Sequence, residues 1–264
     1  MKKYSAGKLS GIREIAFDLD GTIYEGGRLI DGALDTVKAL RAGGYRIIYF
    51  TNNSAKTRKD IYLKLKNFGL PVNMNRVYNS AYATALYLDA KKYRRVYCLG
   101  GNGLFKEIRS RGIKCINGTN AVPEAAVIGL DNGFNYMQLA EVLNVIKKYS
   151  CDIIACNVDR NFPSENGQLM PGCGPIVAAV ESATDKKVSF IAGKPNDYML
   201  SIICRTHNIK RKEILVVGDS FESDIAMGIK FGCKYVLVSA VEKNKYSIKK
   251  INHLTHILNN RSKV

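Results

Sequence analysis

Short apolar segments alternate with longer segments of helical period along most of this chain, and that alternation constrains the fold more than any other feature. The apolar runs EIAFDLD (14–20) and RIIYFTNN (46–53) are separated by GALDTVKALRAGG, where Ala33, Val37 and Leu40 fall on one helical stripe. Strands joined by crossover helices in this way are typical of a parallel sheet. The sequence therefore predicts an α/β fold built on parallel strands.

The alternation continues towards the C-terminus. Further strands are predicted at RVYCLG, AAVIGLD, DIIACN, EILVVGD and KYVLVSA, and further helices at TRKDIYLKLKNFG, YMQLAEVLNVIKKYS, GPIVAAVESATD and FESDIAMGIKFG. Seven strands are more than one compact sheet domain of ordinary size uses, yet the chain has no Pro/Ser-rich linker between two halves. A second domain is therefore expected as an insertion with short connections.

Composition limits the classes of protein to which this chain can belong. With 264 residues, 46% of them hydrophobic, it can bury a large core, and no apolar run reaches the roughly eighteen residues that cross a bilayer. Its first residues lack the pattern of a cleaved signal peptide. Seven cysteines without a C-x-x-C pair fit a reducing compartment. We therefore expect a cytoplasmic protein with no membrane partner.

The formal net charge of +17 attracts anions but does not choose among nucleic acid, an acidic membrane surface and a phosphorylated metabolite. The densest basic segments, KKYRR (91–95) and KNKYSIKK (243–250), are interpreted as solvated helix faces and loops. The tyrosines among them form no spaced platform on which single-stranded bases could stack. Nucleic acid is therefore not the expected partner.

Four polar segments stand at predicted strand ends or in nearby loops. They are DLDGT (18–22), TNNS (51–54), GKP (193–195) and GDSFESD (218–224). In an open parallel sheet, ligands bind beyond the carboxyl ends of the strands, where residues distant in sequence converge. Each segment alone is ordinary turn or capping composition. Their joint occurrence in this order predicts a single site.

Carboxylates dominate these segments. At about 4 Å and an effective dielectric constant near 20, repulsion between the carboxylates of Asp18 and Asp20 would cost on the order of 4 kcal/mol, so a cation or a shared proton is expected there. Asp219 adds a third acid, and Asp224 lies in the first turn of a predicted helix. Oxygen ligands without a neighbouring His or Cys indicate Mg²⁺ rather than zinc.

The four polar segments also contain hydrogen-bond donors and a positive charge that could bind an anion. Thr51 and Asn52 offer a hydroxyl and backbone amides near a helix start, and Lys194 offers a compact positive charge. Carboxylates with Mg²⁺ and these donors become complementary once a phosphoryl group lies between them. The residues therefore predict chemistry at phosphorus.

These segments make the sequence resemble the haloacid dehalogenase superfamily of aspartate-nucleophile phosphatases. FDLDGTIY, YFTNNS, AGKP and GDSFESDI correspond to its four motifs. AVIGLDNGFNY, followed by CNVDRNFPSENGQLMPGCGPIVAAVESAT, resembles the cap domain of the class IIA subfamily, which contains NagD-type, 4-nitrophenyl and phosphoglycolate phosphatases. The resemblance implies a Rossmann-like parallel sheet core at residues 1–80 and 187–264, with an inserted α/β cap domain at residues 81–186.

The resemblance also implies catalytic roles. Asp18 would be the nucleophile that forms an aspartyl phosphate, and Asp20 would protonate the leaving group and then activate water. Mg²⁺ would be bound by the side chains of Asp18 and Asp219 and the backbone carbonyl of Asp20. Asp224 would act from within or near the metal shell.

Substrate contacts follow from the same resemblance. Thr51, Asn52, Asn53 and Lys194 would hold the transferring phosphate. Asn157 and Asp159, in the loop after DIIAC, are candidates for touching the leaving group. The alternative for NVDRNFP is a tight structural turn.

The sequence is compatible with three functions. The first is a Mg²⁺-dependent phosphatase acting on small phosphate monoesters such as nucleotides, sugar phosphates, phosphoglycolate or 4-nitrophenyl phosphate. The second is a phosphotransferase or mutase that uses the same aspartate, and the third, least favoured, is a nucleic-acid-binding protein. Caps of this subfamily can carry a dimer interface, so a homodimer formed through the cap stays open.

Overall fold

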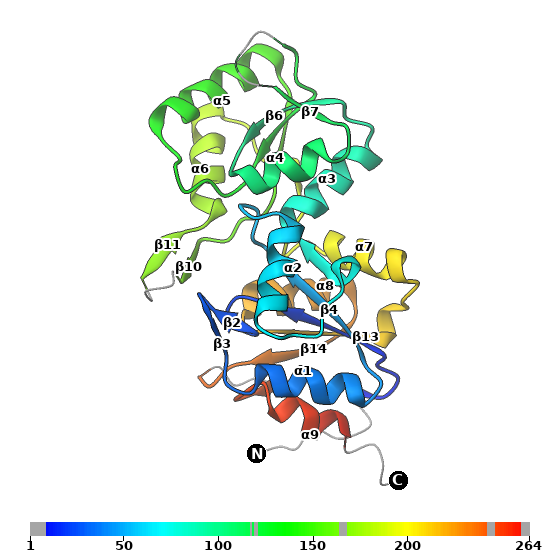
Figure 1. The fold of residues 1–264 in the computed structure, drawn as a ribbon. Helices are drawn as coiled ribbons and strands as arrows, with labels where there is room; N and C mark the ends of the chain where they lie inside the picture. Colours follow the sequence, from blue (N-terminus) through cyan, green and yellow to red (C-terminus); the bar gives the residue numbers. More distant parts are fainter. Residues whose placement is uncertain (1–8, 117, 119–120, 164–167, 242–245, 260–264) are drawn as a thin grey trace. The chain divides into compact units, whose positions relative to one another are not determined.

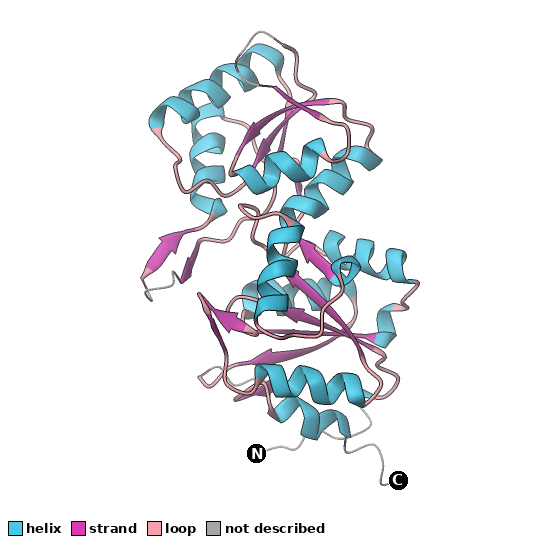
Figure 2. Ribbon diagram, viewed as in Figure 1, coloured by secondary structure: helices cyan, strands magenta, loops and turns pink. Residues whose placement is uncertain are grey.

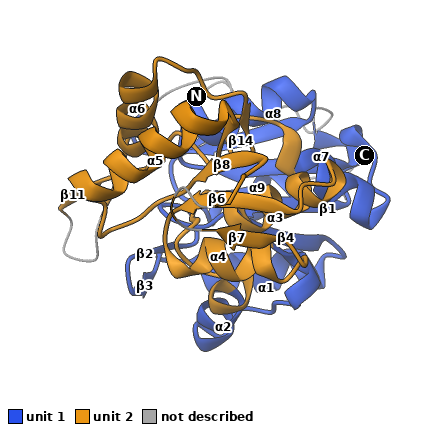
Figure 3. Ribbon diagram, turned by 90° about the horizontal axis from the view of Figure 1, so that it is seen from above, with its two compact units in different colours: residues 1–51, 62–77, 200–264 blue, residues 52–61, 78–199 orange. Residues whose placement is uncertain are grey.

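The computed structural model describes residues 9–116, 118, 121–163, 168–241 and 246–259. Contacts divide the chain into two compact units (Figure 3). Unit 1 comprises Met1–Thr51, Tyr62–Val77 and Leu200–Val264, and unit 2 comprises Asn52–Ile61 and Tyr78–Met199. Parallel sheets with surrounding helices confirm the predicted α/β class (Figure 2). The predicted domain limits at residues 81 and 186 stay a prediction.

The main sheet of unit 1 has the strand order β15-β14-β13-β1-β4-β5. The bounds are β1 (Glu14–Asp18), β4 (Arg46–Thr51), β5 (Val77–Asn79), β13 (Ile214–Gly218), β14 (Lys234–Val238) and β15 (Ser247–Ile248). Strand β1 pairs in parallel with β13 and β4, with Phe17 opposite Val217 and Asp18 opposite Phe50. Since β1 is central, all its residues are buried, which explains its nearly continuous apolar sequence.

Helices and one hairpin complete the elements of this part of the chain. They are the hairpin β2 (Tyr24–Glu25) and β3 (Arg28–Leu29), the helices α1 (Ala33–Ala42), α2 (Arg58–Asn67), α7 (Tyr198–His207), α8 (Ala226–Phe231) and α9 (His253–Asn259), the 3-10 turns η2 (Met74–Arg76) and η3 (Arg211–Glu213), and the π-helical turn η4 (Phe221–Ile225). Helices α1 and α9 pack together on one face of the sheet (Figure 1). The predicted stripe of Ala33, Val37 and Leu40 is buried in α1.

Unit 2 has its own sheet, with the order β12-β9-β8-β6-β7 and only parallel pairs. The bounds are β6 (Arg95–Leu99), β7 (Lys114–Ile116), β8 (Ala125–Ile128), β9 (Asp152–Ala155) and β12 (Phe190–Ile191). A separate antiparallel hairpin consists of β10 (Asn161–Pro163) and β11 (Leu169–Pro171). Because β6, β8 and β9 run in the same direction, the residues that follow them reach one edge of this sheet.

Two pairs of helices cover the sheet of unit 2. They are α3 (Ser80–Ala90) with α4 (Asn102–Arg109), and α5 (Tyr136–Tyr149) with α6 (Cys173–Thr184). Val142 of α5 and Ile176 of α6 belong to one apolar cluster, and Leu88 of α3 and Leu104 of α4 belong to another. The two clusters fill opposite faces of the sheet (Figure 1).

In the described ranges, no helix is both long enough and apolar enough to cross a bilayer. All seven cysteines are free thiols, five of them buried. The five buried thiols therefore act as small apolar residues in the core.

Candidate active site

Three neighbouring strands of unit 1 end in polar side chains. Asp18 ends β1, Thr51 ends β4, and Asp219 directly follows β13. Because β1 lies between β13 and β4 and pairs in parallel with both, the three residues reach the same edge of the sheet. That edge is where open parallel sheets bind ligands.

Asp18, Asp219 and Asp224 form a cluster of carboxylates. One oxygen from each lies within 4.8 Å of the others, and Asp18 and Asp224 are only 3% and 1% exposed, whereas Asp219 is exposed. Buried carboxylates this close repel one another unless a cation or a proton is shared. An oxygen-only donor set with one exposed member fits Mg²⁺, which binds through a few carboxylates and keeps water ligands.

The turn after β1 fits against this cluster. The Leu19 carbonyl accepts the backbone N–H groups of Thr22, Ile23 and Tyr24 at 3.3, 2.9 and 3.1 Å. Gly21 has φ +86°, and a Cβ placed there would lie 2.2 Å from Asp219 Oδ2. The turn therefore needs glycine for its backbone conformation and for space beside the carboxylate.

We expect Gly21→Ala to weaken Mg²⁺ binding by about tenfold or more, because the added methyl group must displace the Asp219 carboxylate. Titration calorimetry with Mg²⁺ measures the effect. Gly27→Ala is the matched control, since a Cβ there meets no atom within 4 Å. Native-like Mg²⁺ affinity in folded Gly21→Ala would contradict the assignment of Asp219 to the metal site.

Two hydroxyl groups hold the carboxylate of Asp20, which is itself exposed. Thr51 Oγ1 donates to Asp20 Oδ2 at 3.3 Å, and the Tyr24 hydroxyl also bonds this carboxylate. Burial, followed by the charges of Asp20 and Asp18, raises the pKa of Tyr24, which is 3% exposed. Tyr24 therefore stays protonated and donates its hydrogen to Asp20.

Asp224 is fixed by the turn that follows β13. Its Oδ2 accepts the Ser220 N–H at 3.2 Å, and a Cβ at Gly218 would lie 2.3 Å from its Cγ. The residue belongs to the π-helical turn η4 rather than to a regular first helical turn. The glycine at the strand end therefore lets the Asp224 carboxylate pack directly against the backbone.

Asn52 and Lys194 of unit 2 interlock through hydrogen bonds. Asn52 Oδ1 accepts the Lys194 N–H at 2.8 Å, and Asn52 Nδ2 donates to the Lys194 carbonyl at 3.1 Å and to Asp159 Oδ1 at 2.9 Å. These bonds use both hydrogens of the Asn52 amide. Asn52 is buried and Lys194 is 4% exposed. The Asn52 side chain therefore positions the Lys194 backbone and the Asp159 carboxylate.

Asn157 joins the same network. Its Nδ2 donates to the Asn52 carbonyl at 2.7 Å, and its Oδ1 accepts the Asp159 N–H at 3.1 Å. Ser80 Oγ donates to the same Asn52 carbonyl at 2.6 Å. Since Asn157 is buried and both ends of its amide are engaged, these bonds favour the structural interpretation of this residue. Asp159 is half-buried.

Asn53 shapes the turn after Asn52. Its Oδ1 accepts the N–H groups of Ala55 and Lys56, each at 3.1 Å. Such a side chain supports a turn by bonding the backbone two and three residues further on. In this structure the Asn53 carbonyl oxygen therefore has a local role.

The predicted residues thus form two groups. Unit 1 brings together Asp18, Asp20, Thr51, Asp219 and Asp224, and unit 2 brings together Asn52, Asn157, Asp159 and Lys194. Sequence reasoning missed Tyr24 and Ser80. Tyr24 belongs to the motif FDLDGTIY and could have been considered, whereas no pattern in the sequence points to Ser80.

Comparison with known families identifies two matching regions. Residues 15–114 match the family described as haloacid dehalogenase-like hydrolase, and residues 191–260 match a second hydrolase family of the same superfamily. Both regions include predicted motifs: the first contains Asp18 and Thr51, and the second contains Lys194 and Asp219.

Curated relatives extend the likeness over most of the chain. Phosphoglycolate phosphatase 1A of Arabidopsis thaliana is 31% identical over 87% of this chain and 69% of its own length. Sugar-phosphatase AraL of Bacillus subtilis is 34% identical over 85% and 82%. Among solved structures, the magnesium complex of glycerol phosphate phosphatase from Mycobacterium tuberculosis has a TM-score of 0.80 and 27% identity, covering 89% of this chain and 70% of that one.

Proposed function

This chain belongs to the haloacid dehalogenase superfamily as a phosphatase for small phosphate substrates, and we propose that it hydrolyses monoesters with Mg²⁺ through an aspartyl-phosphate intermediate. The observation that carries the proposal is the cluster of Asp18, Asp219 and Asp224, whose carboxylate oxygens lie within 4.8 Å of one another. Mg²⁺ bound there would neutralise charge on the phosphoryl oxygens.

Asp18 is the proposed nucleophile. Its buried carboxylate stands at the fixed end of a central strand, so little reorganisation is needed before attack. A bond forms between an Asp18 carboxylate oxygen and phosphorus while the bond from phosphorus to the ester oxygen breaks. Attack of water on the same phosphorus then releases phosphate and restores the carboxylate.

Asp20 is the proposed acid and base. In the first step it gives a proton to the ester oxygen, and in the second it takes one from the attacking water. The hydroxyl groups of Thr51 and Tyr24 restrict the orientation of its carboxylate. Asp20 can therefore serve both steps without a large side-chain movement.

The remaining predicted residues have proposed roles in holding the substrate. Lys194 would offset charge on the transferring phosphate together with Thr51 and backbone amides near Asn53. Asn52 would act by fixing Lys194, consistent with its paired hydrogen bonds to the Lys194 backbone. Asp159 would contact the leaving group, with Asn157 supporting its loop.

The substrate class follows from the relatives. One relative is named for phosphoglycolate, one for sugar phosphates and one for glycerol phosphate, which are all small phosphorylated hydroxy compounds. The net charge of +17 favours approach of such dianions. We therefore place the substrate among phosphate monoesters of short organic acids, polyols and sugars.

Phosphate release from a panel of monoesters tests the proposal. The panel contains phosphoglycolate, glycerol 3-phosphate, glucose 6-phosphate and 4-nitrophenyl phosphate, each with Mg²⁺ or with EDTA. We expect inorganic phosphate only with Mg²⁺. Isomerised sugar phosphate without free phosphate would instead identify a mutase, and no Mg²⁺-dependent turnover of any ester would refute the phosphatase proposal.

Location and assembly complete the proposal. We place the protein in the cytoplasm on the basis of its seven cysteines without a C-x-x-C pair, which fit a reducing compartment. A homodimer formed through residues 81–186 rests on the subfamily resemblance alone. Sedimentation velocity distinguishes monomer from dimer, and a protein that is monomeric at all concentrations tested would refute the homodimer.

A further inference from the structure

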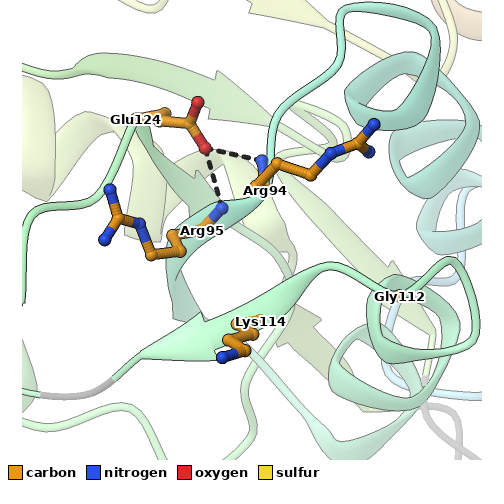
Figure 4. Close-up of a pocket in the computed structure, with 5 residues that line it drawn as sticks. All are labelled: Arg94, Arg95, Gly112, Lys114 and Glu124. Atoms are coloured by element: carbon orange, nitrogen blue, oxygen red, sulfur yellow. Dashed lines mark hydrogen bonds between the residues drawn. The ribbon is translucent and has the colours of Figure 1, made fainter.

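A pocket of about 390 Å³ lies at the amino ends of strands in unit 2, lined by Arg94, Arg95, Gly112, Lys114 and Glu124 (Figure 4). Arg95 begins β6, Lys114 begins β7, and Glu124 directly precedes β8. Because these strands are parallel, the pocket is at the opposite edge of the sheet from Asn157, which follows the carboxyl end of β9. It is therefore distinct from the residues assigned to catalysis in this unit.

Backbone hydrogen bonds fix the frame of the pocket. Glu124 Oε2 accepts the N–H groups of Arg94 and Arg95 at 2.5 and 2.8 Å. The Glu124 N–H donates to the Arg95 carbonyl at 2.8 Å, and the Lys114 N–H donates to the Arg94 carbonyl at 2.9 Å. The bonds from the two backbone N–H groups lower the pKa of Glu124, so this carboxylate stays charged while facing the backbone.

The cations around this frame are poorly compensated. Within the described ranges, no carboxylate lies within 4.0 Å of the charged groups of Arg94, Arg95 or Lys114. Arg95 and Lys114 are register partners on adjacent parallel strands, which puts two basic residues directly opposite each other. Strands in a sheet are only about 4.8 Å apart, and like charges on directly opposed residues destabilise it.

Figure 4 shows how the charged side chains are arranged. Arg94 and Arg95 diverge on either side of the Glu124 carboxylate, and Lys114 extends from the neighbouring strand. All four of these residues are exposed. An anion can therefore reach the side chains of Arg95 and Lys114 from solvent without displacing a carboxylate that is paired with them.

We propose that this pocket binds a small anion carrying phosphate groups, held by the side chains of Arg95 and Lys114 with Arg94 at the rim. Three positive charges against one fixed negative charge leave an excess that a phosphate dianion matches. Because the charged residues that line the pocket are exposed, the anion would be held at the surface by charge and hydrogen bonds rather than by enclosure.

Calorimetric titration with pyrophosphate in EDTA and low salt tests the proposal. The variant Arg95→Gln/Lys114→Gln removes the paired charges, and Lys91→Gln/Lys92→Gln is the control, since it changes net charge equally at neighbouring residues that do not line the pocket. We expect native protein and the control to show a binding event that the pocket variant weakens by about tenfold or more. Orthophosphate as a second titrant shows whether one phosphate group suffices.

Three outcomes would overturn the proposal. They are the absence of pyrophosphate binding by native protein, equal weakening in both double variants, and equal affinity in all three proteins. Equal weakening would mean that diffuse surface charge attracts the anion. Pyrophosphate bound at the phosphate-holding residues of the proposed active site would be distinguished, because that binding would persist in both variants. Failure of the phosphatase proposal would leave this test unaffected.

Discussion

Asp18→Asn is expected to lower kcat for every phosphate monoester by about 10³-fold or more, while the protein stays folded. Asparagine has nearly the same shape as aspartate, so the packing of the buried strand end is kept. Its neutral amide cannot supply the carboxylate oxygen that bonds to phosphorus. Steady-state release of phosphate at saturating substrate measures the effect, with circular dichroism as the check on folding.

Metal binding and nucleophilic attack must be separated in this experiment, because Asp18 also belongs to the carboxylate cluster. The assay is therefore repeated at increasing Mg²⁺ concentration, which can restore a weakened metal site but not a missing nucleophile. Asp35→Asn, at an exposed position in the first turn of α1, is the control for the loss of one charge. Recovery of native kcat by Asp18→Asn at high Mg²⁺ would exclude Asp18 as the nucleophile.

Glu14→Gln is expected to lower the free energy of unfolding of unit 1 by about 3 kcal/mol. This value is at the low end of the range for removing one partner of a buried ion pair. Glu14 is 0% exposed and bonds both Arg46 Nε and Arg76 Nη1, the latter at 2.6 Å. Neutralising Glu14 leaves two guanidinium groups without their shared partner. Because the side chains of Arg46 and Arg76 are partly exposed to water, we expect the loss of stability at the low end of that range.

Urea denaturation monitored by hydrogen exchange of the amides in β1 and β4 measures this loss of stability in unit 1. Arg13→Gln is the control, because Arg13 is the adjacent residue and its ion pair with Glu213, at 3.9 Å, involves an exposed side chain. Surface pairs of this kind contribute little. A Glu14→Gln protein as stable as Arg13→Gln would show that the buried cluster does not stabilise the sheet.

The main sheet and its polar strand ends could be predicted because both depend on local patterns. A central parallel strand is buried on both faces, so EIAFD reads as an apolar run that ends at Asp18. Glycines at the ends of α1 and α2 and the Thr57–Asp60 capping pair marked where helices begin and end. These signals lie within a few residues of the structure they determine.

Interactions between distant residues could not be predicted in the same way. The pairing of Asn52 with Lys194 joins positions 142 apart in the sequence, and it gives the Asn52 side chain a positioning role that the motif alone does not reveal. Glu14 reads as one polar residue at a strand start, although it organises two arginines. KKYRR likewise gave no sign that Arg95 stands beside Lys114.

The nucleophile can be identified most directly in Asp20→Asn mixed with 4-nitrophenyl phosphate and Mg²⁺. The 4-nitrophenolate leaving group is weakly basic and needs no proton from Asp20, whereas hydrolysis of the aspartyl phosphate needs Asp20 as a base. The intermediate should therefore form and persist in this variant. Rapid acid quenching followed by peptide mass spectrometry locates the phosphoryl group.

We expect one phosphoryl group on the peptide that contains Asp18, formed together with one equivalent of 4-nitrophenolate and absent when EDTA replaces Mg²⁺. A phosphoryl group on any other residue would contradict the proposed role of Asp18. So would repeated release of 4-nitrophenolate by Asp20→Asn at the native rate with no phosphorylated peptide, since water would then attack the substrate directly.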